Sequence, residues 1–188
     1  AAKAMKATDP SIKLIAAGSG NYGADWRLWN RTVLQTLRNL IDYIALHTYI
    51  NNSANDFERY LGTAQQNVDL YIESTANQIK EVMTGPNPRP IYIAYDEWNV
   101  WYRTHSAEHT NGRGKFAPPL IEEHYNLEDA LVVAGFLNSF IRHADSVKIA
   151  NIAQIVNVIA PILTRGDDML LQTIFYPFAM YSSRRDGV

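Results

Sequence analysis

Four apolar runs separated by amphipathic segments constrain the fold of this chain more than any other feature. The runs span residues 12–17, 41–46, 90–94 and 147–158, and they contain many β-branched residues. Within each run the apolar residues follow one another almost continuously instead of alternating with polar ones. This pattern is typical of strands that helices cover on both faces. The runs therefore predict a parallel sheet.

Segments with helical periodicity lie between and after these runs. Trp26 and Trp29, for example, belong to one stripe of apolar residues at spacings of three and four. Asn126 is placed to cap a later helix, and Pro177 is expected to interrupt the last one. The expected helices are residues 25–40, 53–83, 126–144 and 168–181. The chain therefore alternates strand and helix four times.

This alternation fits either an open doubly wound sheet or part of a closed (β/α)8 barrel. The Gly-x-Gly-x-x-Gly spacing occurs only once, at residues 18–23 after the first run, whereas polar and aromatic residues crowd the carboxyl ends of all four runs. Barrel enzymes carry their active sites at that end of the strands. The predicted fold class is therefore α/β, a partial (β/α)8 TIM barrel. A complete barrel takes about 250 residues, so four repeats are about half of one.

The composition argues against several kinds of partner. The formal net charge is −2 and no basic run exceeds Arg184-Arg185, so we expect no nucleic acid or anionic membrane partner. No apolar run reaches the roughly 18 residues of a membrane-spanning helix. The chain has no cysteine, which fits a reducing compartment, and the cytoplasm is the expected location. Residues 1–6 and 182–188 look like the cut ends of longer elements.

Two acidic residues follow the third apolar run. An apolar strand should not end in Asp96 and Glu97 unless the carboxylates face something polar. Successive strand residues face opposite ways, so only one of the two is expected to point into a barrel mouth. Trp98, Trp101 and Tyr102 offer flat apolar faces that suit a sugar ring beside a reacting carboxylate. The alternative is that Asp96 caps a turn and Glu97 forms a surface salt bridge.

Three segments resemble glycoside hydrolase family 51, the α-L-arabinofuranosidases. They are residues 44–49 (IALHTY), 95–102 (YDEWNVWY) and 151–161 (NIAQIVNVIAP). The similarity extends over essentially the whole chain in the correct order. It implies that the four strands correspond to strands five to eight of that family's (β/α)8 barrel. Residues 1–184 would form the C-terminal half of the catalytic domain, and residues 185–188 would begin the connection to a β-sandwich.

The resemblance also implies roles for individual residues. Glu97 would be the nucleophile of a retaining enzyme that releases arabinofuranosyl residues from polysaccharides and oligosaccharides, without metal or organic cofactor. Tyr49 would hydrogen-bond that carboxylate, Trp101 would line the sugar subsite, and Gln154 would contact sugar hydroxyls. His47 is expected either to orient a substrate hydroxyl or a carboxylate, or to be an interior histidine satisfied by backbone.

The sequence departs from the family pattern at the second catalytic acid. A retaining glycosidase needs a protonated carboxyl about 5–5.5 Å from the nucleophile. In this family that acid is a Glu preceded by Asn, and the chain contains no Asn-Glu dipeptide. We therefore expect the chain to supply the nucleophile but not the general acid/base, and to need the N-terminal half of the barrel as a partner. Alone it should be weakly active or inactive.

Two alternatives to this function remain open. One is a non-catalytic half-barrel that binds sugar or assembles with a partner chain; the other is a β-xylosidase or endoglucanase specificity. A half-barrel would leave backbone groups unpaired at its first and last strands, so the chain alone should dimerise, aggregate or stay loosely packed. The full enzyme is expected to be a homo-oligomer.

A short metal-binding pattern appears after the third apolar run. Residues 105–109 read His-Ser-Ala-Glu-His, which matches a zinc protease motif when it lies on a helix. Glycines and prolines follow closely, so a helix is not expected there. We interpret the segment as part of a long loop, residues 104–125, that either shapes the subsite for the leaving group or packs against a neighbouring domain.

Overall fold

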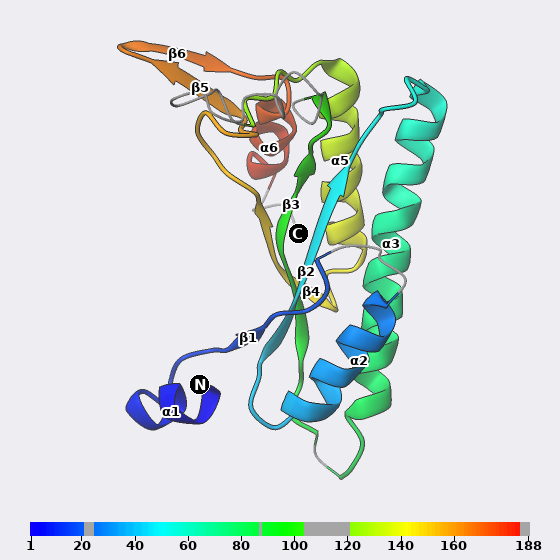
Figure 1. Ribbon diagram of the computed structural model, residues 1–188, viewed down its shortest axis with the longest axis vertical. Coiled ribbons are helices and arrows are strands. Elements are labelled where there is room, and N and C mark those ends of the chain that lie inside the picture. Colours follow the sequence, from blue (N-terminus) through cyan, green and yellow to red (C-terminus); the bar gives the residue numbers. More distant parts are fainter. Residues whose placement is uncertain (21–24, 87, 104–120, 185–188) are drawn as a thin grey trace, which may run out of the picture. The chain divides into compact units, whose positions relative to one another are not determined.

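The computed structural model describes residues 1–20, 25–86, 88–103 and 121–184. Its principal sheet has four strands in the spatial order β1-β2-β3-β4, which is also their order along the chain (Figure 1). The strands are β1 (Ile15–Ala16), β2 (Tyr43–Ile50), β3 (Tyr92–Val100) and β4 (Val147–Ile152). β1 pairs with β2 in parallel, with Ile15 opposite Tyr43. The prediction of an α/β fold with a parallel sheet is therefore confirmed.

The predicted alternation of strand and helix holds from β1 to β4, whereas a short helix precedes β1 and two further strands precede the last helix. The helices are α1 (Ala2–Thr8), α2 (Trp26–Leu37), α3 (Phe57–Val82), α5 (Leu127–Arg142) and α6 (Phe175–Ser182). Asp56 begins α3 by accepting a hydrogen bond from the N–H of Arg59. Asn126 caps α5 as predicted, because its Oδ1 accepts from the N–H of Asp129 while Asp129 Oδ2 accepts from the N–H of Asn126.

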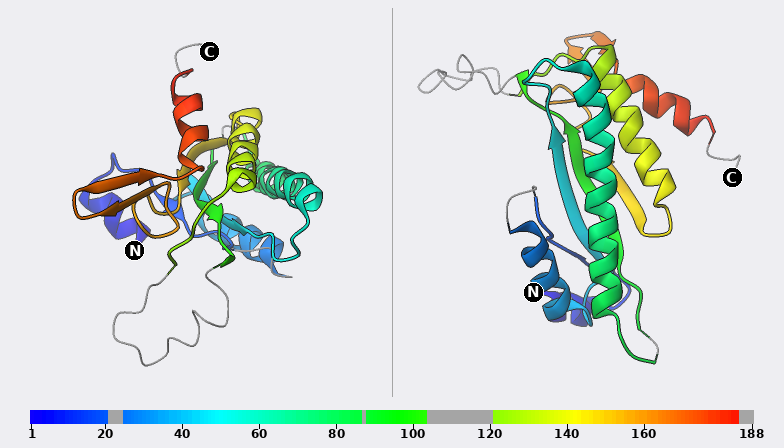
Figure 2. Two further views of the ribbon diagram at one scale, coloured as in Figure 1. Left: turned by 90° about the horizontal axis from the view of Figure 1, so that it is seen from above. Right: turned by 90° about the vertical axis from the view of Figure 1, so that its right-hand side faces the viewer.

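The first compact unit comprises Ala1–Thr48, Val68–Trp98 and Phe140–Asn151. In it, α2 lies alongside residues 68–82 of α3 (Figure 2), where Trp26 meets Tyr71 edge to face at 4.7 Å. Gly18 lies so close to β2 that a Cβ there would come within 1.9 Å of the Ala45 carbonyl oxygen. Trp29 belongs to the same apolar stripe as Trp26 but is 55% exposed, and its indole N–H donates to the carbonyl of Ala17.

The second compact unit comprises the described residues of Tyr49–Asn67, Asn99–Ser139 and Ile152–Val188. Its interior contains Phe136, Val133 and Ile174, all almost completely buried. A two-stranded antiparallel hairpin of β5 (Ile162–Arg165) and β6 (Asp168–Leu171) also belongs to it.

This hairpin corrects the prediction of one helix over residues 168–181. Residues 168–171 pair with β5, and α6 begins only at Phe175. The two-residue loop begins with Gly166, whose φ of +58° suits a tight hairpin turn. Pro177 does not interrupt α6 either, because it lies in the first turn, where no intrahelical hydrogen bond needs its missing N–H.

Two predicted strands are shorter than expected. Only Ile15 and Ala16 of residues 12–17 are in a strand, and β4 ends at Ile152 rather than at residue 158. The reason for the second difference is a backbone with positive φ at Gln154, Asn157 and Ile159, which cannot continue an extended strand.

Candidate active site

Strand β3 carries both candidate carboxylates within its length. Asp96 and Glu97 are half-buried, with 26% and 43% of their side chains exposed. On either side, Tyr95 and Trp98 are fully buried. The Tyr95 hydroxyl is 2.5 Å from Oγ1 of Thr48, and Trp98 packs on Phe140 with ring centroids 5.1 Å apart. The two acids are thus presented by a rigid element, as a catalytic residue requires.

His47 brings the two acids together. Its Nε2 lies 3.0 Å from Oδ1 of Asp96, which is hydrogen-bond distance. Its Nδ1 lies 3.6 Å from Oε2 of Glu97, an electrostatic contact rather than a hydrogen bond. Of the two roles expected for His47, the geometry therefore favours orientation of a carboxylate. The sequence predicts a carboxylate partner for His47 but does not identify it as Asp96.

Trp98 cannot serve as a platform for a sugar ring. The sequence predicts flat faces beside the acids from Trp98, Trp101 and Tyr102, but none of the Trp98 surface is exposed. The reason is its packing on Phe140, a ring that Tyr95 also contacts.

In the second unit, Tyr49 and Trp101 meet. Their ring centroids are 5.3 Å apart and their planes make an angle of 74°, an edge-to-face contact. The N–H of Trp101 donates to the carbonyl of Ile50, which continues the pairing of β2 with the residue after β3. Two of the predicted substrate-binding residues thus form one aromatic surface. That Tyr49 hydrogen-bonds Glu97 stays a prediction.

A buried polar network holds the chain after Trp101. The N–H of Tyr102 donates to Oε1 of Glu123, and the hydroxyl of Tyr125 donates to the carbonyl of Val100. Glu123 is almost completely buried, with an exposed fraction of 1%. Sequence reasoning missed this residue because Glu122-Glu123-His124 reads as an ordinary polar loop.

Arg103 and Asp129 form an ion pair in the same network. Arg103 Nη1 is 2.9 Å from Asp129 Oδ2, and the Asp129 carboxylate also accepts from the hydroxyl of Tyr60. Burial and the nearby negative charge of Asp129 raise the pKa of Tyr102 to about 12. The same two causes raise the pKa of Tyr60 well above its ordinary value. Both phenols are therefore neutral hydrogen-bonding groups at physiological pH.

Gln154 lies on a loop with an unusual backbone. Its φ is +63°, and Asn157 and Ile159 in the same loop also have positive φ. Such conformations persist only where the surroundings enforce them. Asn99 does so here: it is fully buried, and its Nδ2 donates to the carbonyls of Ala153 and Ile159. The side chain of Gln154 is exposed, as a residue that contacts a ligand must be.

No metal centre appears in the part of the chain that the structure describes. That part holds no group of three or more His, Cys, Asp or Glu side chains placed to bind a metal ion. Residues 105–109, with the zinc-like pattern, lie outside the described residues, as does most of the predicted loop 104–125. Every helix of the described residues is too short or too polar to cross a bilayer.

Comparison with known proteins gives concordant results. A family model described as the α-L-arabinofuranosidase C-terminal domain matches residues 96–188. An intracellular exo-α-(1→5)-L-arabinofuranosidase of Halalkalibacterium halodurans is 42% identical over the whole chain and 38% of its own length. A similarly named protein of Bacillus subtilis is 42% identical over 94% of the chain and 36% of its own length. The chain thus spans little more than a third of these relatives.

Solved structures agree with the sequence matches. A family 51 α-L-arabinofuranosidase from Bifidobacterium longum superimposes with a TM-score of 0.83, at 29% identity, over 97% of this chain and 39% of that one. The α-L-arabinofuranosidase of Thermotoga maritima, in an arabinose complex, gives 0.71 at 29% identity, over 94% of this chain and 32% of its own. The family expected from the sequence motifs is therefore confirmed: the chain belongs to the C-terminal region of the family 51 α-L-arabinofuranosidases.

Proposed function

We propose that this chain supplies the nucleophile, Glu97, of a retaining glycoside hydrolase that releases terminal α-L-arabinofuranosyl residues. The observation that carries the proposal is the placement of His47 between Asp96 and Glu97 on adjacent strands. An imidazole anchored by one carboxylate and facing the other orients a nucleophile that is still exposed enough to reach a substrate. The names of the relatives favour arabinofuranosides over xylosides or glucans.

The reaction proceeds in two displacements. Glu97 attacks the anomeric carbon, the bond to the leaving oxygen breaks, and a second carboxylic acid donates a proton to that oxygen. Water, deprotonated by the same second group, then attacks the anomeric carbon and releases Glu97 as a carboxylate. Neither step calls for a metal ion or an organic cofactor, because protons and a carboxylate carry the whole reaction.

The second carboxylic acid is proposed to come from outside these 188 residues. The sheet β1-β2-β3-β4 then forms strands five to eight of a (β/α)8 barrel, and the N-terminal half of that barrel is the partner that carries the acid/base. The assembled enzyme is proposed to be a homo-oligomer. The cytoplasm is the proposed location, supported by the word "intracellular" in the names of the relatives.

The remaining site residues are proposed to bind the sugar. Trp101, held edge to face by Tyr49, provides an apolar wall for the arabinofuranose ring. Gln154 contacts the sugar hydroxyls from a loop that Asn99 holds in a strained conformation. His47 acts on Glu97 rather than on the substrate.

The decisive experiment is intact-mass analysis after incubation with an aryl α-L-arabinofuranoside whose leaving group needs no acid assistance. The expected result is an arabinosyl adduct that peptide mapping places on Glu97. Glu97→Gln should form no adduct, and Glu58→Gln, at an exposed position outside the candidate site, is the matched control. If the chain forms no adduct, even when it replaces the corresponding segment of the Bacillus subtilis relative, Glu97 is not a nucleophile. Unchanged sugar binding by Glu97→Gln would then identify a non-catalytic sugar-binding module.

A further inference from the structure

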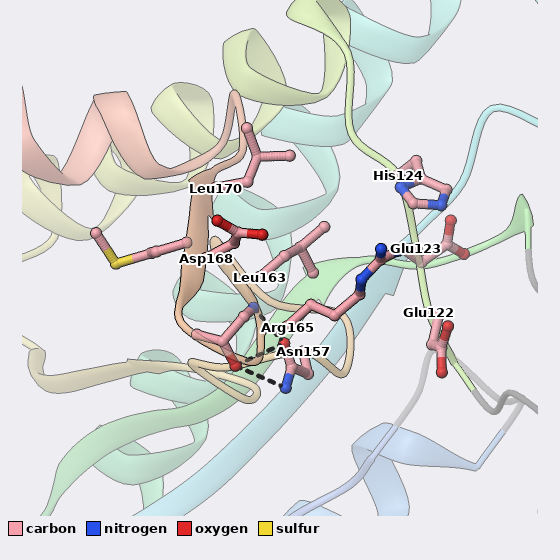
Figure 3. Close-up of a pocket in the computed structure, with 10 residues that line it drawn as sticks. Glu122, Glu123, His124, Asn157, Leu163, Arg165, Asp168 and Leu170 are labelled. Carbon is pink, nitrogen blue, oxygen red and sulfur yellow. Dashed lines mark hydrogen bonds between the residues drawn. The ribbon is translucent and has the colours of Figure 1, made fainter.

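The second unit contains an open pocket with a volume of about 670 Å³ (Figure 3). One wall is the segment 122–124 ahead of α5, and the opposite wall is the hairpin of β5 and β6. Small-molecule sites commonly have volumes on the order of 300–1,000 Å³. The pocket is therefore large enough for a sugar unit, and it contains neither Glu97 nor Trp101.

Five charged or ionisable residues line this pocket. Glu123 is almost completely buried and accepts from the N–H of Tyr102. The other four are Glu122, His124, Arg165 and Asp168. Within the described part of the chain, no hydrogen bond or ion pair engages any of these four side chains. Figure 3 shows Arg165 extended across the pocket toward the 122–124 segment. Their hydrogen-bonding capacity is thus available to a ligand.

The chemistry of the lining favours a neutral ligand with many hydroxyl groups. The guanidinium of Arg165 donates several hydrogen bonds, and the carboxylates of Asp168 and Glu122 accept them. Positive and negative charges therefore both face the pocket. A phosphate would be repelled by the carboxylates, and an ammonium group by the guanidinium. Hydroxyl groups both donate and accept, so they match this mixture. Leu163 and Leu170 add apolar surface for the C–H groups of a sugar ring.

Both walls are tied to the segments that carry the proposed sugar-binding residues. Glu123 accepts from the N–H of Tyr102, the residue that follows Trp101. On the other side, Asn157 belongs to the loop of Gln154, and its Oδ1 accepts from the N–H of Thr164 in β5. The pocket is therefore continuous in structure with the loops of the sugar site.

We infer that this pocket is a subsite for a further neutral sugar unit of an arabinofuranosyl-containing oligosaccharide, bound through Arg165 and Asp168. The inference rests on the proposed function. It adds that the protein prefers oligosaccharides to single sugars, and that this preference comes from the β5–β6 hairpin.

Calorimetric titration with L-arabinose and with an α-(1→5)-linked arabinofuranotriose tests the inference. The trisaccharide is expected to bind about 10-fold or more tightly than the monosaccharide, because hydrogen bonds to charged groups contribute substantially to binding. Arg165→Gln and Asp168→Asn should each remove most of that advantage and leave the affinity for L-arabinose unchanged. Arg59→Gln and Asp167→Asn, at exposed positions outside the pocket lining, are the matched controls and should retain it.

The outcomes separate this inference from the proposed function. Suppose that Glu97 forms its arabinosyl adduct but the trisaccharide binds no more tightly than L-arabinose, or binds as tightly to both pocket variants as to the wild type. The subsite is then overturned and the proposed nucleophile stands. Binding of inorganic phosphate that Arg165→Gln abolishes would also overturn it. If neither the adduct nor any sugar binding is found, both ideas fail together.

Discussion

His47 and Asp96 are joined by a hydrogen bond of 3.0 Å between Nε2 and Oδ1, on neighbouring strands of the parallel sheet. This bond to Nε2 leaves the other ring nitrogen, Nδ1, facing Glu97. Strand alternation alone would have placed Asp96 and Glu97 on opposite faces. The contacts of His47 bring both acids into one cluster.

Removing the anchor of His47 should therefore slow the labelling of Glu97. In Asp96→Ala the imidazole can rotate, and the rate of adduct formation is expected to fall by roughly 10- to 100-fold, as for other small misplacements of catalytic groups. Asp96→Asn keeps an oxygen that accepts a hydrogen bond and should lose less. Time-resolved intact mass measures both rates, with Asp145→Asn as the control. Equal rates in all variants would show that Asp96 does not position the site.

Asn99→Ala should destabilise the fold and disorder the loop of Gln154. The change leaves the buried carbonyls of Ala153 and Ile159 without the donor that holds them. Because each such loss costs about 1–3 kcal/mol, the free energy of unfolding should fall by about 2–4 kcal/mol. Urea denaturation measures the change, and Asn39→Ala at an exposed position should show almost none. A loss below 0.5 kcal/mol for Asn99→Ala, on the order of a neutral surface change, would contradict this role.

Removing one partner of the ion pair between Arg103 and Asp129 should destabilise the protein more than replacing both partners. Asp129→Asn leaves the guanidinium without its carboxylate, and the free energy of unfolding should fall by about 2–3 kcal/mol. The loss is smaller than for a fully buried pair because 29% of the Arg103 side chain is exposed. Denaturant titration checks this, with Glu58→Gln as the exposed control. Replacing both partners by leucine should recover part of the loss.

Stability at acid pH should depend on Asp42. Burial raises the pKa of this carboxyl, but the N–H of Leu14 and the charges of Arg89, Lys13 and Lys6 outweigh burial and hold the pKa below its ordinary value of 3.8. A lowered pKa in the folded state contributes stability above the unfolded pKa and loses it as the pH falls through the folded pKa. The difference in unfolding free energy between the wild type and Asp42→Asn should therefore be largest at neutral pH and shrink below about pH 3.8. Thermal melts across this pH range measure the difference, and Asp145→Asn is the control for the loss of one carboxylate. A difference between the wild type and Asp42→Asn that grows at low pH would contradict this role of Asp42.

Local sequence was sufficient for the elements with strong periodic or capping signals. The apolar runs at residues 41–46 and 90–94 predicted β2 and β3, because both faces of each strand must be covered. The observed strands extend further, to Ile50 and Val100. Helix α5 follows from Asn126 and the acidic residues after it, since capping depends only on neighbours in the chain. The motif around Glu97 likewise identified the family without any structure.

Other elements could not be derived from local pattern. Residues 168–171 are apolar enough for a helix, and only their pairing with β5 across Gly166 makes them a strand. Trp98 and Trp101 are equally aromatic in sequence, yet packing against Phe140 buries the first, whereas the second, the residue after β3, stays partly exposed.

The sequence by itself determined the α/β class with its parallel sheet and the family, and it predicted Glu97 as the central acid, because periodicity and contiguous motifs are properties of neighbouring residues. Only the tertiary structure decided that His47 lies between Asp96 and Glu97, that Glu123 and Asp129 are buried behind the Trp101 segment, and that Asn99 holds the loop of Gln154. These are contacts between residues up to 60 positions apart. Their energies depend on burial and direction, which no local pattern encodes.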